Sequence, residues 1–149
     1  MLQNQLLDQW SPKETTTHQD HVIAHVIGAT VLGYFVHDEA LHLLLDMGFI
    51  WTIYLDGQMV LLPQSVAISE LEAEPEIKAE LNREVEKLDR ERRQVQGLQH
   101  ITPAPLECLL TEVSFLANDE RRRLILVGEE ASLVVETSLS TAEIKIAGL

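Results

Sequence analysis

The sequence predicts an α+β fold, mainly antiparallel β, in which one long helix connects two groups of strands. Residues 30–62 are rich in β-branched and aromatic side chains, as is typical of strands. A similar pattern returns without a gap in residues 111–143. Residues 69–96 instead carry apolar side chains at the spacing of one helix face. We therefore expect a duplicated four-strand meander with a connecting helix, arranged as a small barrel or as two packed sheets.

The duplication depends on residues that match at equivalent positions of the two segments. The matched pairs are Thr30/Thr111, Leu32/Val113, Tyr34/Phe115, Val36/Ala117, His37/Asn118, Asp38/Asp119, Glu39/Glu120, Leu43/Leu124, Leu44/Ile125, Leu45/Leu126 and Ile53/Val134. Such an internal repeat indicates two copies of one structural unit. The alternative is that two hairpins of similar chemistry look alike by chance, because alternation followed by an acidic turn is common among strands.

Length and composition indicate one globular domain after an N-terminal extension. The chain has 149 residues, of which 46% are hydrophobic and 23% are charged, and this suits a single hydrophobic core. Residues 1–21 show little periodicity, so we expect a partly mobile extension there. The remainder, residues 22–149, forms the domain, with the first meander in 22–62, the helix in 69–96 and the second meander in 106–146.

Charge and cysteine content argue against several classes of function and location. The net charge of −13 opposes binding to a phosphate backbone or to an anionic membrane surface, so we expect no nucleic-acid or membrane partner. Cys108 is the only cysteine and has no internal disulfide partner, which favours a reducing, cytoplasmic location. No apolar run approaches the roughly 20 residues of a membrane span, and the first residues lack the pattern of a signal peptide.

The first meander is expected to have strands at residues 22–36, 41–46, 49–55 and 58–62. Gly28 and Gly33 indicate a bulge or bend in the first of these strands. Asp56-Gly57 is the clearest hairpin signal and predicts a type I′ turn, which needs positive φ at both central residues. Because these strands are apolar on both faces, we expect the sheet to be covered on both sides. The helix is one candidate cover, and the other meander or a second subunit is the other.

The helix is bounded by capping signals. Ser69 with Glu72 fits a capping box at its start, and Pro75 fits its first turn. Gly97 fits the C-cap. The apolar stripe is narrow, so the helix either lies shallowly across a sheet or pairs with its counterpart in a second subunit. We favour packing on a sheet.

The second meander is less apolar than the first. Its strands are expected at residues 106–117, 122–127, 132–137 and 142–146. Arginines at 121–123 alternate with the acidic residues Glu112, Glu136 and Glu143 across neighbouring strands. We therefore expect one face of this meander to meet water, with salt bridges that cross between strands.

Histidines are the most concentrated candidates for chemistry. On a helix, His18, His21 and His25 would share one face at the spacing of metal ligands. The β-branched residues around them favour a strand instead, on which His21 and His25 point the same way. His37 and His42 of the first hairpin would complete such a site from neighbouring strands. One hypothesis is a divalent metal bound by His21, His25, His37 and His42. The alternative is that the histidines lie on the surface or form ordinary hydrogen bonds.

Signals for catalysis are absent from the sequence. Cys108 has no basic neighbour in sequence to lower its pKa, which is typical of a buried structural thiol. The chain has no Gly-x-Ser-x-Gly elbow, P-loop or dinucleotide-binding fingerprint. The acidic pairs Asp38-Glu39 and Asp119-Glu120 fit turns better than an acid/base pair. We expect no catalytic residues and, apart from the metal considered above, no cofactor.

Arginines and one tryptophan are the candidates for binding a partner. They are Trp10, Arg90, Arg92, Arg93, Arg121, Arg122 and Arg123. If the end of the helix lies near the turn before the second strand of the second meander, these arginines would hold an acidic segment or a phosphorylated ligand. The alternative is that the arginines neutralise acidic neighbours within the chain.

The absence of a catalytic constellation favours a non-catalytic binding or assembly module that acts through protein–protein contacts. We expect it to self-associate as a homodimer, formed by a meander edge, the helix stripe or the N-terminal extension. Another protein is a second candidate partner. A metal-binding protein or metal-dependent enzyme that uses the region of His21 and His25 is the competing hypothesis. A weaker alternative is a β barrel that binds a small apolar ligand near Phe49, Trp51, Tyr54 and Met59.

Overall fold

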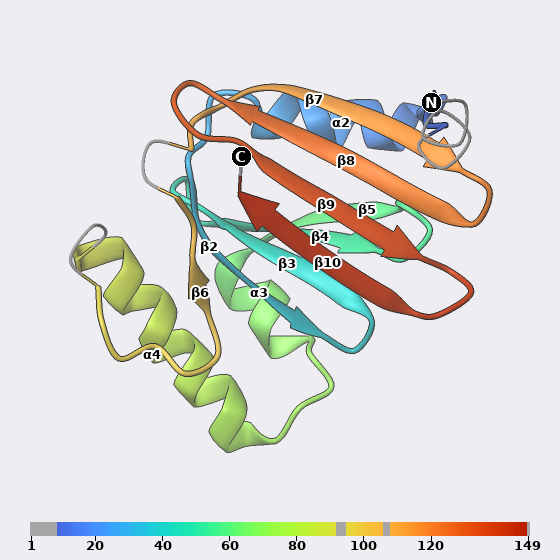
Figure 1. The fold of residues 1–149 in the computed structure, drawn as a ribbon. Coiled ribbons are helices and arrows are strands. Elements are labelled where there is room, and N and C mark those ends of the chain that lie inside the picture. The colour runs from blue at the N-terminus through green and yellow to red at the C-terminus, as the bar shows by residue number, and fades with distance from the viewer. Residues whose placement is uncertain (1–8, 92–94, 106–107, 149) are drawn as a thin grey trace.

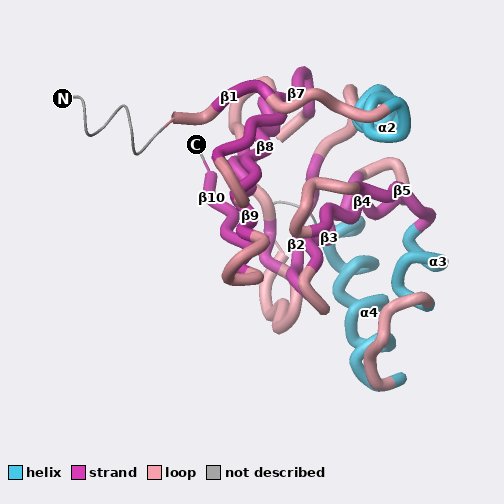
Figure 2. Tube along the Cα trace, turned by 90° about the vertical axis from the view of Figure 1, so that its right-hand side faces the viewer, coloured by secondary structure: helices cyan, strands magenta, loops and turns pink. Residues whose placement is uncertain are grey.

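The computed structural model describes residues 9–91, 95–105 and 108–148. Its strands form two five-stranded sheets that pack face to face, and two helices cover the far side of one of them (Figure 1, Figure 2). Every strand pair within the sheets is antiparallel. The predicted α+β fold, mainly antiparallel β, is therefore confirmed. The sheets do not close into a barrel, so the chain adopts the second of the two expected arrangements, the packed sheets.

The two sheets follow the two predicted meanders, and each gains one short strand from elsewhere in the chain. The C-terminal sheet has the order β1 (Ser11–Pro12), β7 (Leu110–Asn118), β8 (Arg121–Gly128), β9 (Leu133–Ser138) and β10 (Glu143–Gly148). The N-terminal sheet has the order β5 (Met59–Pro63), β4 (Phe49–Tyr54), β3 (Ala40–Leu45), β2 (Val31–His37) and β6 (Thr102–Pro103). The helices of the described residues are α2 (Thr17–Val26), α3 (Gln64–Ser69) and α4 (Pro75–Glu91).

The main core lies between the two sheets. Alternate residues of each strand point into it, as the pleat of a strand requires. From the N-terminal sheet these include Leu43 and Trp51, and from the C-terminal sheet Leu124 and Val135, all fully buried. Ile144 and Ile146 of β10 pack against the same core but stay half-buried, because β10 lies at the edge of its sheet.

A second core lies on the other face of the N-terminal sheet. Leu81, Val85 and Leu88 of α4 pack there against Phe35 and the neighbouring strands, together with α3. The N-terminal sheet is thus covered on both sides, as its two apolar faces predict. The narrow apolar stripe of α4 packs against this sheet, which is the alternative that the sequence favoured.

The boundaries of the long helix differ from the prediction. Residues 64–69 form α3, and α4 starts only at Pro75, which occupies the first helical position. Ser69 therefore does not begin a helix. Its hydroxyl donates to the Val66 carbonyl at 3.0 Å, at the end of α3. The expected capping box of Ser69 with Glu72 is wrong, because the chain turns between the two helices.

Residues 17–26 are helical, whereas the sequence pattern favoured a strand from residue 22. The helix α2 starts with a capping box in which Gln19 N donates to Thr16 Oγ1 at 3.1 Å, and Thr16 N donates to Gln19 Oε1 at 2.9 Å. These reciprocal bonds satisfy backbone donors that a helix start leaves open. They outweigh the modest strand preference of the β-branched residues that follow. The expected boundary at residue 21 therefore falls inside a helix.

The hairpin turns also differ in type from the prediction. The Asp38-Glu39 turn has positive φ at both residues, 51° and 59°, as a type I′ turn requires. The predicted type I′ turn at Asp56-Gly57 is wrong, because only Gly57 has positive φ there. Gly57 N instead donates to the Tyr54 carbonyl at 2.9 Å, which makes a longer hairpin loop. At the position equivalent to Asp38, Asp119 also has positive φ, while the sequence duplication itself stays a prediction.

The two sheets are held together at both ends. At one end Thr30 bridges to Leu109, and Val31 N donates to the Cys108 carbonyl at 3.0 Å. At the other end Thr137 Oγ1 donates to the Leu55 carbonyl at 2.5 Å. Beside this bond the loop of the β4–β5 hairpin reaches across to the C-terminal sheet. These connections fix the position of the sheets and of the surfaces they expose.

Candidate interaction surfaces

The structure does not gather the four histidines that the sequence suggested as metal ligands. His21 and His25 are exposed on α2, where His25 Nδ1 donates to the His21 carbonyl at 2.8 Å. His37 ends β2, and its Nε2 donates to the Glu72 carbonyl at 3.2 Å. His42 is buried on the face covered by α3 and α4. Across residues 9–91, 95–105 and 108–148, no group of three or more His, Cys, Asp or Glu is arranged to hold a metal ion. The metal hypothesis therefore stays a prediction without geometric support.

His42 is a core residue. Its ring stacks on Phe35 with the ring centroids 4.7 Å apart, and its Nδ1 is hydrogen-bonded to Thr52 Oγ1 at 2.8 Å. Its Nε2 is buried and has no hydrogen-bond partner in the described part of the chain. Burial lowers the pKa of His42 to about 4, because desolvation disfavours the charged imidazolium. The side chain is therefore neutral at pH 7.

The arginines that the sequence grouped together lie apart. Arg121 and Arg123 of β8 stack on the ring of Trp10, with their guanidinium carbons 4.9 Å and 4.2 Å from its centroid. Arg123 also pairs with Glu136 on β9, a cross-strand salt bridge of the predicted kind. Arg90 lies on α4, beyond the other sheet (Figure 1). The predicted cluster is therefore not formed by the described residues, and Arg92 and Arg93 lie outside them.

The Trp10 site joins the start of the described chain to its second half. Pro12 pairs with Leu116, and Lys13 N donates to the Phe115 carbonyl at 2.8 Å, so this segment adds a strand to the C-terminal sheet. The two arginines gain cation–π contacts with Trp10. Most of this arrangement is internal, because Trp10 is half-buried and Arg123 is paired. We assign it a structural role rather than the role of a partner site.

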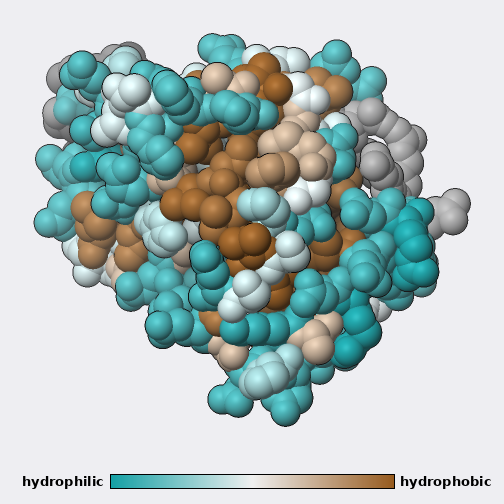
Figure 3. Space-filling view, turned by 180° about the vertical axis from the view of Figure 1, so that it is seen from behind, coloured by the Kyte–Doolittle hydropathy of each residue, from teal (hydrophilic) through white to brown (hydrophobic). Residues whose placement is uncertain are grey.

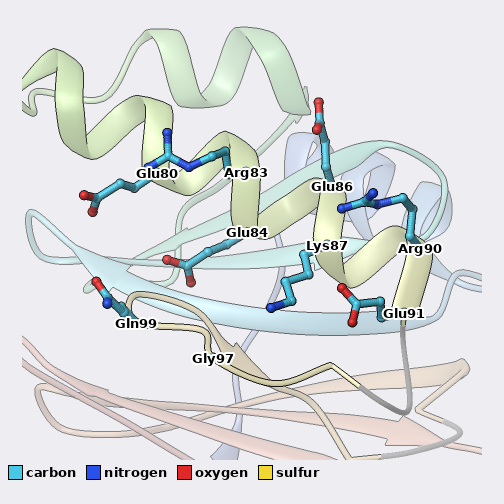
Figure 4. Close-up of a pocket in the computed structure, with 9 residues that line it drawn as sticks. All are labelled: Glu80, Arg83, Glu84, Glu86, Lys87, Arg90, Glu91, Gly97 and Gln99. Atoms are coloured by element: carbon cyan, nitrogen blue, oxygen red, sulfur yellow. The ribbon is translucent and has the colours of Figure 1, made fainter.

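An open groove of about 600 Å³ runs between α4 and residues 97–99 (Figure 4). Its charged side chains all come from α4 and are of both signs: Glu80, Glu84, Glu86 and Glu91 alternate with Arg83, Lys87 and Arg90. Two of the carboxylates already have partners. Glu84 accepts bonds from His100 N and Ile101 N at 3.0 Å each, and Glu80 Oε2 lies 2.5 Å from His100 Nε2. The described residues that line the groove therefore offer no convergent set of groups for a ligand.

Comparison with known proteins gives no relative. No family model, no curated protein and no solved structure matches the chain. In the described part of the chain, no helix has both the length and the apolar character needed to cross a membrane.

The strand β10 offers an edge that pairs only with β9 among the described strands. Leu139 N donates to the Glu120 carbonyl at 3.0 Å, which shows which residues of β9 are hydrogen-bonded to β8. Successive residues of an antiparallel strand direct their backbone groups to opposite sides, so the residues of β9 between them are hydrogen-bonded to β10. Glu143 and Lys145 are the β10 residues opposite this second set, and their backbone groups therefore bond to β9. The backbone N–H and C=O of Ile144 point away from the sheet, toward the free edge.

The side chains of this edge are also arranged in alternation. Glu143 and Lys145 lie on the outer face of the sheet, with Lys145 Nζ 3.6 Å from Glu143 Oε2. Ile144 and Ile146 point to the core and are half-buried. Toward the end of the strand, Gly148 lies against Pro105, whose Cγ is 3.4 Å from a Cβ built on that glycine. The accessible part of the edge is therefore centred on Ile144.

A strand was expected at residues 142–146, and Glu143 was named there only as a salt-bridge residue. The alternation of Glu143 and Lys145 with two isoleucines was the available signal. What the sequence could not supply was the order of strands, which makes β10 an edge.

Proposed function

We propose that this protein is a non-catalytic assembly module that forms a homodimer through the β10 edges of two copies. The observation that carries the proposal is the backbone of Ile144, which faces outward on a six-residue edge strand. Unpaired N–H and C=O groups on such an edge are a template for pairing with another strand. Two copies related by a two-fold axis would join their C-terminal sheets into one continuous sheet.

Side-chain charge selects one register for this pairing. If Ile144 lies opposite Ile144 of the second copy, Glu143 lies opposite Lys145 of that copy, and symmetry repeats the pair. A register centred on Lys145 would instead place two lysines opposite each other. A register centred on Ile146 would use Gly148, where Pro105 lies close. The register centred on Ile144 is therefore the one that the charges and the available edge favour.

A lysine on an edge strand often opposes association, because it has no acceptor on an incoming strand. Here Glu143 supplies that acceptor, since it lies two residues from Lys145 and on the same face. The half-buried Ile144 and Ile146 would also lose their remaining exposure to water. The contact is small compared with the ~800 Å² per partner of standard interfaces. We therefore expect a dimer that dissociates measurably at micromolar concentrations.

The test is a charge-swap series followed by sedimentation velocity over a range of protein concentrations. Glu143→Lys and Lys145→Glu each replace two favourable cross-strand pairs with two like-charge pairs. At 0.2–1 kcal/mol for each pair, each single variant should dimerise about tenfold more weakly. The double variant E143K/K145E restores opposite charges in the same register and should dimerise like the wild type.

The series contains its own control for net charge. Glu143→Lys makes the acidic chain less negative, and Lys145→Glu makes it more negative, so an effect of overall repulsion would move the two variants in opposite directions. The proposal requires both to weaken the dimer. A wild-type protein that stays monomeric at 100 μM concentration, roughly a hundred times the micromolar range expected of a weak contact, would refute it. A double variant that fails to recover would refute the register.

A further inference from the structure

A separate apolar surface lies on the opposite side of the molecule from the C-terminal sheet. Figure 3 shows apolar side chains gathered there, and in Figure 2 the strand β5 lies between α2 and α3 on this side. Three of the exposed large apolar residues of the described chain come from the segments that meet here. They are Ile27, which is 40% exposed, Met47 at 39% and Val66 at 38%.

Hydrogen bonds place these segments side by side. His18 Nε2 donates to the Met59 carbonyl at 2.9 Å, so the start of α2 lies at the start of β5. At the other end of α2, Thr30 N donates to Asp46 Oδ1 at 3.0 Å, which brings the chain after Ile27 to the β3–β4 turn.

The same turn also meets the start of α3. Gln64 N donates to the Gly48 carbonyl at 3.0 Å, which brings Val66 to the other side of the turn that carries Met47. The helix α2 therefore runs beside β5 from end to end. The half-buried Ile23 and Leu61, from α2 and β5, continue the surface between its exposed residues. We name the surface formed by Ile23, Ile27, Met47, Leu61 and Val66 the α2–β5–α3 surface.

The charges around this surface are acidic. The helices α2 and α3, the strand β5 and residues 46–48 contain no lysine or arginine. Asp20 and Asp46 are exposed beside it, and Glu70 follows the end of α3. Lys78 contacts α3 only at its far end, where its Nζ donates to the Ser69 carbonyl at 2.8 Å. An apolar strip with an acidic rim is complementary to a helix that has one apolar face and basic flanks.

We infer that the α2–β5–α3 surface binds a basic amphipathic helix of another protein. Apolar residues of that helix would lie over Ile27, Met47 and Val66, and its lysines or arginines would approach Asp20 and Asp46. A second copy of this chain is the less suitable occupant, because its net charge is −13 and its α4 carries both signs of charge on its outer face. This binding is independent of the β10 edge.

The experiment uses two labelled peptides and fluorescence anisotropy on the full chain. The probe is a leucine–lysine helix of about 18 residues, five turns long, with leucines on one face. The matched control peptide has glutamate in place of lysine. We expect the lysine peptide to bind and the glutamate peptide not to bind, and we expect the affinity to fall as salt screens the charges.

Variants locate the binding site. Ile27→Asp and Val66→Asp should each weaken binding about tenfold, as loss of a central apolar contact does, although they add negative charge that attracts the peptide. Leu139→Asp is the matched control, because Leu139 is 44% exposed on the β9–β10 loop, away from this surface. It should leave binding within about twofold of the wild type. Thermal unfolding followed by circular dichroism verifies that each variant is folded.

Three results would overturn the inference. Equal losses in Leu139→Asp and Val66→Asp would mean that the peptide binds the acidic chain without using this surface. Equal binding of the two peptides would remove the charge complementarity. Loss of the dimer in Ile27→Asp, measured by sedimentation velocity, would mean that a second copy covers the surface. The same measurement on Glu143→Lys would separate this outcome from failure of the β10 interface.

Discussion

Substitution of Gly57 by alanine should add a methyl group that disturbs the contact between the two sheets. The residue lies in the β4–β5 hairpin loop with φ +91°, and Gln19 Nε2 donates to its carbonyl at 2.8 Å. A Cβ built on Gly57 overlaps the ring of Phe115 and comes within 2.9 Å of Cε1. Phe115 is buried in the main core between the two sheets. Gly57→Ala therefore tests the contact between the sheets directly.

The expected destabilisation has two parts. A non-glycine residue in the left-handed region costs about 1–2 kcal/mol. Insertion of a methyl group into a packed site costs about 1–3 kcal/mol more. Gly57→Ala should therefore lower the free energy of unfolding by about 2–5 kcal/mol, a large share of the total of a domain this size.

Gly28→Ala is a matched control for backbone strain. Gly28 has φ +92°, almost the same as Gly57, but no atom lies within 4 Å of a Cβ built on it. Urea unfolding followed by circular dichroism should show only the smaller cost for Gly28→Ala, about 1–2 kcal/mol. In a Phe115→Ala background the two alanine substitutions should cost about the same. Equal costs in the wild-type background would refute the packing of this loop against Phe115.

Two further predictions concern the titration of His42 and the hydrogen bonds that Glu84 accepts. The folded-state pKa of His42 is about 4, below its ordinary value of 6.5, so its contribution to stability is fully present above pH 6.5 and is lost as the pH falls toward 4. His42→Gln removes this contribution, and urea unfolding between pH 7 and pH 4 should show the wild type losing up to about 3 kcal/mol more than the variant; parallel profiles would contradict a neutral, buried His42. Glu84→Ala leaves His100 N and Ile101 N without their acceptor and should lower the free energy of unfolding by about 2 kcal/mol. The control Glu86→Ala, on the exposed side of the same helix, should change it by less than about 0.5 kcal/mol. Equal effects would show that the hydrogen bonds to Glu84 contribute nothing to stability.

The strands were predictable because their side chains alternate along the chain. Those of the second meander and three of the first appear close to the positions that alternation indicated. The helix α2 was missed because Val22, Ile23 and Val26 suit a strand, while the capping box of Thr16 and Gln19 was not recognised. Capping bonds are local, so the sequence contained the signal that decided the structure.

Other features depend on distant parts of the chain. Trp10 meets Arg121 and Arg123 only because β1 joins the edge of the C-terminal sheet, a pairing that has no signature in either segment. His42 was grouped with His21 as a metal ligand. In the structure it lies opposite Phe35 of β2, on the face of the N-terminal sheet that helices cover. Strand order and layer order decide such contacts, and periodicity along one segment does not contain them.

The free edge of β10 depends on strand order in the same way. The sequence suggested that Glu143 forms salt bridges between strands, whereas in the structure its carboxylate lies 3.6 Å from Lys145 Nζ within β10 itself. The outward direction of the Ile144 backbone follows from the ladder with β9 and from the position of β10 at the end of the sheet. The proposed dimer therefore rests on topology, and a test should report on the backbone of this residue.

Amide hydrogen exchange of Ile144, measured by NMR at several protein concentrations, is that test. Lys145 is the internal reference, because its N–H points to β9 in every copy and should be protected at all concentrations. We predict that the Ile144 amide exchanges rapidly in the dilute monomer and becomes protected in proportion to the dimer fraction. An Ile144 amide that exchanges at the same rate in monomer and dimer would contradict pairing through the β10 edge.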